Sequence, residues 1–173
     1  MPDITIIAGP NGAGKTSFAN EYLTSFGEDA VYVNADEIAR ELAEPPHGAL
    51  LRERYAARLM LEQINALVAA QKNFVFETTL ASLGYARKIN AWRQQGFYVS
   101  LMYLRLAKVE DSLLRIQKRV AAGGHDIPEH VVRRRFQKSI DYFTRIYKPI
   151  VDQWYVWDSL NGYFRLAETG AAQ

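Results

Sequence analysis

Gly9-Pro-Asn-Gly-Ala-Gly-Lys15-Thr16 is the stretch of sequence that decides the fold of this 173-residue chain. It follows the apolar run Ile4–Ala8 and opens a segment that is compatible with a helix. Every fixed position fits the pattern G-x-x-x-x-G-K-[ST], in which glycines let successive backbone N–H groups curl around an anion. The start of the following helix adds the positive end of its dipole. We therefore expect a phosphate-binding loop rather than a glycine-rich turn with a solvated lysine.

The residue types in this loop indicate how it would hold a nucleotide. The Lys15 side chain is expected to reach the outer phosphates, and the Thr16 hydroxyl is expected to hold Mg²⁺. ATP or GTP together with Mg²⁺ is therefore the predicted cofactor. The predicted nucleotide contacts are Gly9, Pro10, Asn11, Gly12, Ala13, Gly14, Lys15, Thr16 and Ser17.

The composition is that of an ordinary globular protein, with 49% hydrophobic and 23% charged residues. The length predicts a single domain over residues 1–173. A net charge of +2 gives no argument for a nucleic-acid partner. The absence of cysteine excludes a disulfide framework, a zinc-thiolate site and a thiol nucleophile. We see no charged leader and no long apolar run, so we expect a cytoplasmic protein without membrane contact.

Apolar runs alternate with helical patterns along the rest of the chain. This alternation predicts an α/β fold with a mainly parallel central sheet and helices on both faces. Further strands are expected at 30–33, 74–76 and 97–104, and further helices at about 50–68, 82–95, 108–122 and after Pro128.

Several element boundaries follow from local signals. The first helix is expected to end near Ser25, and the second is expected to end at Pro45-Pro46. A strand, an Asn161-Gly162 turn and a second strand are expected from Trp154 to Leu166, with a frayed tail from Thr169. The apolar stripe expected to face the core in the long helix is Leu50, Ala57, Leu61, Ile64 and Val68.

Two acidic residues come directly after predicted strands. Asp36 follows the strand at 30–33, and Glu77 follows the strand at 74–76. Ligands of open parallel sheets bind at the carboxyl ends of the strands, so both acids are expected beside the phosphate loop. Asp36 is equally well explained as a capping or first-turn acid of the next helix. The recurrence of the same geometry favours a functional role for Glu77.

Arginines lie on both sides of the flexible break at 123–128. Arg115 and Arg119 stand four residues apart, and a nearby anion or simple solvation would explain these like charges on one helix. The run Arg133-Arg-Arg135 is expected in the first turn of the next helix, where it would oppose the helix dipole. We interpret residues 119–135 as an arginine-bearing helical lid, because guanidinium groups bind phosphates in a bidentate manner.

Other motifs narrow the class of protein. No stretch matches the guanine-reading motif N-K-x-D, and no long apolar strand ends in the Asp-Glu pair that is usual in motor ATPases. One phosphate loop, acids at strand ends and an arginine lid favour phosphoryl transfer to a small acceptor, since positioning and charge neutralisation do most of that catalysis.

These residues resemble the zeta-toxin-like kinases, in their compact single-domain branch. The resemblance implies a three-layer P-loop kinase-like fold and transfer of the γ-phosphate from a nucleoside triphosphate to a hydroxyl of a UDP-sugar such as UDP-N-acetylglucosamine. It also implies a possible antitoxin protein as a partner. The stretches that carry it are Gly9 to Thr16, Asn34-Ala-Asp36, Phe76-Glu-Thr-Thr79, Arg119 to Pro128, and Arg133-Arg134.

The resemblance implies roles for single residues. Asp36 matches the acid that takes the proton of the acceptor hydroxyl, and Glu77 and Thr79 match a substrate-contacting pair. Arg119 and one of Arg133 or Arg134 match lid arginines on the phosphates. The implied catalytic set is Lys15, Asp36, Arg119 and Arg134, with Arg119 and Arg133 also at the nucleotide.

Two positions depart from the family pattern. Ala81 stands where the toxins have an arginine after Glu-x-Thr, and Ala39 stands where they have an arginine three residues after the catalytic acid, with Arg40 one position later. These differences leave the acceptor open. The alternatives are a kinase of another metabolite, a nucleoside or an antibiotic, and a nucleotide-regulated protein-binding ATPase module.

Overall fold

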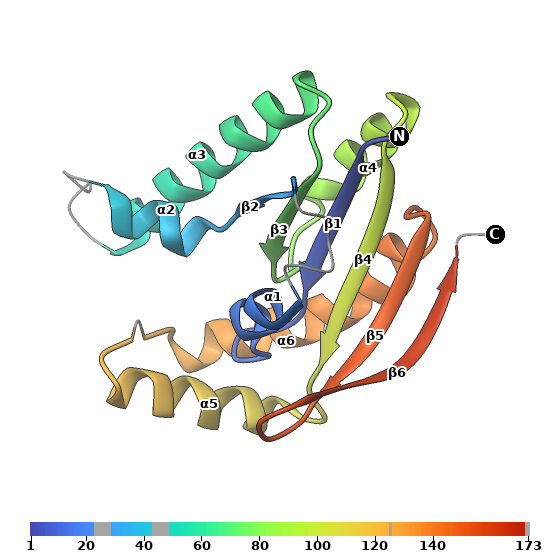
Figure 1. Cartoon of the computed structure of the whole chain (residues 1–173). Coiled ribbons are helices and arrows are strands. Elements are labelled where there is room, and N and C mark those ends of the chain that lie inside the picture. Colours follow the sequence, from blue (N-terminus) through green and yellow to red (C-terminus); the bar gives the residue numbers. More distant parts are fainter. Residues whose placement is uncertain (23–28, 43–48, 125, 172–173) are drawn as a thin grey trace.

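In the computed structural model, which describes residues 1–22, 29–42, 49–124 and 126–171, helices cover both faces of a central sheet (Figure 1). Within these ranges six strands form one sheet in the order β2-β3-β1-β4-β5-β6. Neighbouring strands from β2 to β5 are parallel, and β6 is antiparallel to β5. The mainly parallel sheet is thus confirmed. Its strands are β1 (Asp3–Ala8), β2 (Val31–Val33), β3 (Phe74–Thr78), β4 (Tyr98–Arg105), β5 (Gln153–Ser159) and β6 (Phe164–Ala171).

The helices connect these strands close to the predicted positions. The predicted helix ends near Ser25 and at Pro45-Pro46 lie outside the described residues. No helix in the described ranges is long and apolar enough to cross a lipid bilayer. The helices are α1 (Lys15–Tyr22), α2 (Ala35–Glu41), α3 (Ala49–Ala69), α4 (Gly84–Gln94), α5 (Val109–Ala121), α6 (Glu129–Tyr142) and the π-helical turn η2 (Phe143–Tyr147).

β1 lies inside the sheet, between β3 and β4, and its residues 4–8 are all buried. Ile4 and Ile6 belong to the core cluster that includes residues of α3 and α4. Ile7 belongs to the second cluster, which includes Phe18 of α1. A parallel strand covered on both faces needs apolar side chains at every position, which explains the uninterrupted apolar run in the sequence.

α3 turns Ile64 and Val68 to the core as predicted and leaves Leu61 half-buried, but the predicted stripe is wrong at Ala57. Ala56, Met60, Ile64 and Val68 are buried, whereas Ala57 is exposed. The spacing of four residues is that of one helix face. The error arose because two adjacent alanines have the same hydropathy, so the sequence does not show which of them faces inward. The side chain of Leu50 lies outside the described part of the chain.

β6 extends to Ala171, so the prediction of a frayed tail from Thr169 is wrong. The Thr169 hydroxyl accepts a hydrogen bond from Gln153 Nε2 at 3.0 Å. The next residue, Gly170, lies against the indole of Trp154, where a Cβ atom would come within 2.3 Å of Cζ2. These contacts with β5 keep the end of the chain in the sheet.

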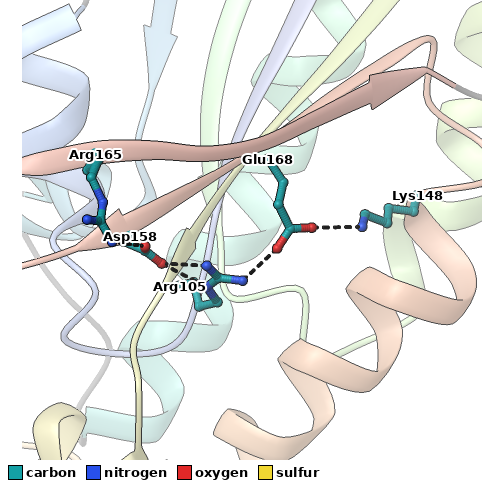
Figure 2. Close-up of polar contacts among 5 residues, drawn as sticks. All are labelled: Arg105, Lys148, Asp158, Arg165 and Glu168. Carbon is teal, nitrogen blue, oxygen red and sulfur yellow. Dashed lines mark hydrogen bonds and ion pairs between the residues drawn. The ribbon is translucent and has the colours of Figure 1, made fainter.

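Ion pairs bind the last three strands together on one face of the sheet (Figure 2). Arg105 on β4 lies 2.8 Å from Asp158 on β5 and 2.7 Å from Glu168 on β6. Asp158 also accepts from Arg165 at 3.0 Å, and Glu168 lies 3.8 Å from Lys148. The hydrogen bonds from Arg165 and Arg105 lower the pKa of the Asp158 carboxyl. The network therefore fixes the antiparallel edge strand against its parallel neighbours.

Candidate active site

The loop between β1 and α1 has a backbone conformation that glycine adopts readily and other residues rarely do. Gly9 and Gly12 have φ values of +147° and +77°. A Cβ atom on Gly9 would lie 2.5 Å from Leu104 O, and one on Gly12 would lie 3.0 Å from Ser112 O. Both the backbone conformation and the close packing therefore require glycine. A loop of this shape at a helix N-terminus fits a phosphate group.

Lys15, the first residue of α1, folds its side chain over this loop. Its ammonium group donates to Gly9 O at 3.0 Å and to Pro10 O at 3.1 Å. The ammonium is strongly desolvated, although the side chain as a whole is only partly buried. This desolvation lowers the pKa of Lys15 to about 8. The lysine is thus held at the loop, in a setting where phosphate oxygens would favour its charged form.

The charges of four nearby residues change the pKa of Lys15. The carboxylates of Glu77 and Asp36 oppose the lowering of its pKa, whereas the positive charges of Arg119 and Arg135 add to it. The structure therefore brings both acids and two lid arginines within electrostatic range of Lys15. From the sequence, Arg135 was predicted only as a member of the arginine run of the lid, and individual phosphate contacts were assigned to Arg119, Arg133 and Arg134.

Glu77 is the centre of a hydrogen-bond network beside the loop. Its Oε2 atom accepts from Thr16 Oγ1 at 3.3 Å, and its Oε1 atom accepts from the Tyr32 hydroxyl and from Asn34 Nδ2 at 3.2 Å. Asn34 Nδ2 also donates to the Tyr32 hydroxyl at 3.0 Å. Burial raises the pKa of Glu77, while the bonds from Tyr32 and Thr16 and the charge of Lys15 oppose this shift.

Tyr32 and Asn34 are site residues that sequence analysis missed. They stand two residues apart, a spacing that places side chains on the same face of an extended segment. A tyrosine followed at that spacing by an asparagine, with Asp36 two residues further on, was the available signal. Burial is the main cause that raises the pKa of Tyr32, so its hydroxyl stays protonated as a donor to Glu77.

Asp36 lies in the first turn of α2, with its carboxylate exposed. The N-cap of this helix is Asn34, whose side-chain oxygen accepts from the Asp36 N–H at 2.8 Å. Asn34, and not Asp36, therefore caps α2, so the capping role that was one explanation of Asp36 is wrong. A favourable interaction with the helix dipole still applies to Asp36.

Thr79 lies just past the end of β3, in the turn that follows Glu77. Its hydroxyl accepts a hydrogen bond from Ala81 N at 3.4 Å, and the hydroxyl of Thr78 accepts from Leu80 N at 3.1 Å. Both threonines thus shape the turn that leaves the sheet beside the site.

The arginine run lies in the second turn of α6, because this helix begins at Glu129. The expected conflict with the helix dipole is therefore wrong, since that effect fades beyond the first turn. Arg133 lies 2.8 Å from Glu129 and 3.2 Å from Glu110 of α5. Arg134 is exposed, and Arg135 is partly buried. Figure 1 shows α5 and α6 side by side, as the two arms of a helical hairpin.

The oxygen atoms at the site fit a nucleotide with a magnesium ion. Mg²⁺ is usually bound by one or two protein oxygens together with phosphate oxygens and waters. The Thr16 hydroxyl, in the first turn of α1, and the Glu77 carboxylate, near the carboxyl end of β3, are hydrogen-bonded neighbours and could supply these protein oxygens. Lys15 and the loop N–H groups could take the phosphates.

Comparison with known proteins gives a family for this chain. Residues 1–156 match the zeta toxin family. An uncharacterised protein from Haemophilus influenzae is 32% identical over 130 residues, which are 74% of this chain and 88% of that protein.

Solved structures resemble the whole fold. A chain of the PezAT chromosomal toxin–antitoxin system of Streptococcus pneumoniae superposes with a TM-score of 0.64 at 16% identity, over 95% of this chain and 72% of that chain. AvrRxo1-ORF1:-ORF2 with ATP gives a TM-score of 0.68 at 18% identity, over 98% of this chain and 58% of that chain. The chain spans only about half the length of some solved chains that it matches. At these identities the likeness concerns the fold, and the predicted P-loop kinase-like fold is confirmed.

Proposed function

Because this chain belongs to the zeta-toxin family, we propose that it is a kinase that transfers the γ-phosphate of ATP to a hydroxyl group of a small acceptor. The observation that carries the proposal is the hydrogen bond between Thr16 and Glu77, which joins the phosphate loop to an acid on the neighbouring strand. Lys15 and Asp36 interact electrostatically at the same edge of the sheet. Donor and acceptor groups would thus meet there.

The acceptor that we propose is a nucleotide-sugar such as UDP-N-acetylglucosamine. Its support is the match of Asp36, Glu77 and Thr79 to the residues that contact the acceptor in the family. Glu77 and Asp36 act on a common neighbour, Lys15, which is consistent with a shared acceptor site. Ala81 and Ala39 replace family arginines, so the acceptor must be found with a panel rather than with one compound.

In the proposed reaction, an oxygen of the acceptor hydroxyl bonds to the γ-phosphorus while the bond from that phosphorus to the β–γ bridging oxygen breaks. Asp36 orients the hydroxyl and takes its proton. Lys15 and the loop N–H groups neutralise the negative charge that develops on the leaving ADP. A magnesium ion bound with the nucleotide would add charge neutralisation, with Thr16 and Glu77 as its protein oxygens.

The lid arginines would complete the charge balance. Arg119 is close enough to influence Lys15, and it is the arginine we assign to the transferred phosphate. Arg133 and Arg134 remain predicted phosphate contacts, and Arg135 joins them because it also acts on Lys15. Closure of α5 and α6 over the nucleotide would exclude water and limit futile hydrolysis.

Radiolabel transfer from ATP to a panel of nucleotide-sugars, nucleosides and sugars tests this function. Label should appear on one acceptor class with the wild-type protein, and both Lys15→Ala and Asp36→Ala should abolish it. Transfer by both variants at the wild-type rate would refute the assignment. ATP hydrolysis without transfer to any acceptor would favour the nucleotide-regulated binding module instead.

The wider setting follows from these substrates. ATP and UDP-sugars are cytoplasmic metabolites, so we propose a cytoplasmic site of action. The similarity to a chain of a toxin–antitoxin system supports an antitoxin protein as a possible partner. Co-purification with the product of a neighbouring reading frame would test that partner.

A further inference from the structure

Three successive carbonyl groups of the phosphate loop, at residues 11–13, are hydrogen-bonded to side chains from outside the loop. Two of these side chains come from α5, and one comes from the end of β5. The pairs are Ser112 Oγ with Asn11 O, Arg115 Nη1 with Gly12 O at 3.3 Å, and Ser159 Oγ with Ala13 O at 2.8 Å. We call Ser112, Arg115 and Ser159 the carbonyl clamp.

The carbonyl clamp explains the environment of Arg115. Its guanidinium also donates to Ser159 Oγ at 2.6 Å, to Ser159 O at 3.0 Å and to Leu160 O at 3.2 Å. These acceptors are hydroxyl and carbonyl oxygens, whereas the sequence suggested either an anion or solvent beside Arg115. One planar fork thus joins the loop to the turn after β5, a task that the single ammonium of lysine cannot perform.

The serine members of the clamp are buried. Ser112 is 0% exposed and Ser159 is 6% exposed, so bulk water does not compete for the hydrogen bonds of their hydroxyl groups. The loop also packs directly on α5, since a Cβ atom on Gly12 would lie 3.4 Å from Arg115 Cβ. The outer side of the loop is therefore fixed against α5 and β5 by both packing and hydrogen bonds.

Fixing these carbonyls has a consequence for the opposite side of the loop. A loop that curls around an anion turns its N–H groups inward, and the inward N–H dipoles repel one another. External partners on the carbonyls hold this shape before the anion arrives. Preorganisation of this kind strengthens binding, because less conformational freedom is lost when the ligand binds.

We propose that Ser112, Arg115 and Ser159 are positioning residues that hold the phosphate loop in its nucleotide-accepting shape. The inference rests on the proposed function, in which this loop binds ATP. It adds a role for α5: the helix fixes the loop through Ser112 and Arg115 and presents Arg119 one turn later. The hydrogen bonds from α5 thereby fix the position of the start of the lid relative to the phosphate loop.

The test compares variants of the carbonyl clamp and a control variant with the wild-type protein by titration with a fluorescent ATP analogue and by thermal unfolding. Ser159→Ala and Arg115→Lys should each raise the dissociation constant about fivefold to tenfold, the effect of losing one or two hydrogen bonds. Ser139→Ala is the matched control, because Ser139 is also 0% exposed, but its hydroxyl is hydrogen-bonded to the Tyr103 hydroxyl at 3.1 Å and not to a carbonyl of the loop. It should lower the unfolding temperature without weakening nucleotide binding.

Wild-type affinity in Ser159→Ala and Arg115→Lys would overturn the proposal, and so would equal weakening by Ser139→Ala. Ser159→Thr keeps the hydroxyl and should bind more tightly than Ser159→Ala if the bond to Ala13 O is what matters. The proposed function fails separately, if the wild-type protein binds the analogue no better than Lys15→Ala does.

Discussion

Thr16 Oγ1 donates a hydrogen bond to Glu77 Oε2 across 3.3 Å, although the two residues are 61 positions apart in the sequence. Parallel pairing of β1 with β3 sets Ala8 opposite Thr78 and so brings the carboxyl ends of both strands together. Strand pairing thus places the Glu77 carboxylate beside the phosphate loop, where its oxygen atoms and the Thr16 hydroxyl could both bind a metal ion. Glu77 is therefore expected to act on the metal and the phosphates as well as on the acceptor.

Glu77→Gln tests this double role. The amide keeps the size of the side chain but removes its charge, so we expect kcat to fall about 100-fold and the required Mg²⁺ concentration to rise. Steady-state phosphoryl transfer measured over a Mg²⁺ titration gives both values. Glu62→Gln, at an exposed position on α3, should change neither. Unchanged Mg²⁺ dependence in Glu77→Gln would remove Glu77 from the metal site.

Asp36→Asn should slow phosphoryl transfer without weakening nucleotide binding. The amide cannot take a proton, so kcat is expected to fall about 100-fold to 10,000-fold while the dissociation constant for ATP stays nearly constant. Glu37→Gln is a matched control, since Glu37 lies beside Asp36 in the first turn of α2. Equal losses in both variants would point to stability of α2 rather than to proton transfer.

Alanine variants of the arginine run separate the members of the lid. Arg135 acts on Lys15, whereas Arg133 is paired with Glu129 and Glu110. We expect Arg135→Ala to lower kcat/KM for ATP about tenfold to 100-fold, and Arg133→Ala to have a smaller effect. Parallel assays of both variants give the comparison. A larger loss in Arg133→Ala would mean that its ion pairs break when the lid closes.

Much of the fold could be predicted because strong local signals agree with one another. A parallel sheet that binds its ligand at the carboxyl ends of the strands agrees with three of these signals. They are the apolar run at residues 4–8, the glycine-rich loop and the β-α alternation. The Asn161-Gly162 turn likewise predicted the final hairpin. The prediction of the buried face was wrong at Ala56 and Ala57 of α3, because these neighbouring residues have equal hydropathy. The predicted end of β6 was wrong because contacts with β5, which the local sequence does not show, hold its last residues.

The site was predicted less completely than the fold, because several of its contacts depend on packing between distant segments. Tyr32 reaches Glu77 only because β2 and β3 are paired. The helix phase that turns Arg135 rather than Arg134 inward depends on where α6 begins. Arg115 carries a charge that suggested a phosphate ligand or solvation, yet its hydrogen bonds go to backbone and hydroxyl oxygens.

Asp158→Asn tests the network that fixes the edge of the sheet. Loss of the charge weakens the bonds from Arg105 and Arg165, and we expect a fall of about 1 kcal/mol in unfolding free energy at pH 7, since solvent screens partly exposed pairs. The folded-state pKa of Asp158 is lowered, so its contribution exists above about pH 4 and disappears as the pH falls through that lowered value. Urea unfolding at pH 7 and pH 3 should therefore show a smaller acid loss in the variant. An equal acid loss would place the titrating group elsewhere.

Nucleotide affinity should fall as the pH rises above about 8. In the nucleotide-free protein, desolvation lowers the pKa of Lys15 to about 8, and negative phosphates at the loop would raise it again. Binding above pH 8 must then take up a proton, so affinity declines by at most about tenfold per pH unit until the raised pKa is reached. Titration calorimetry from pH 7 to 9.5 in buffers of different ionisation enthalpy measures both the affinity and the proton uptake. Lys15→Arg keeps its charge throughout this range. Its affinity, although weaker, should be nearly independent of pH, and a slope equal to that of the wild-type protein would assign the proton to another group.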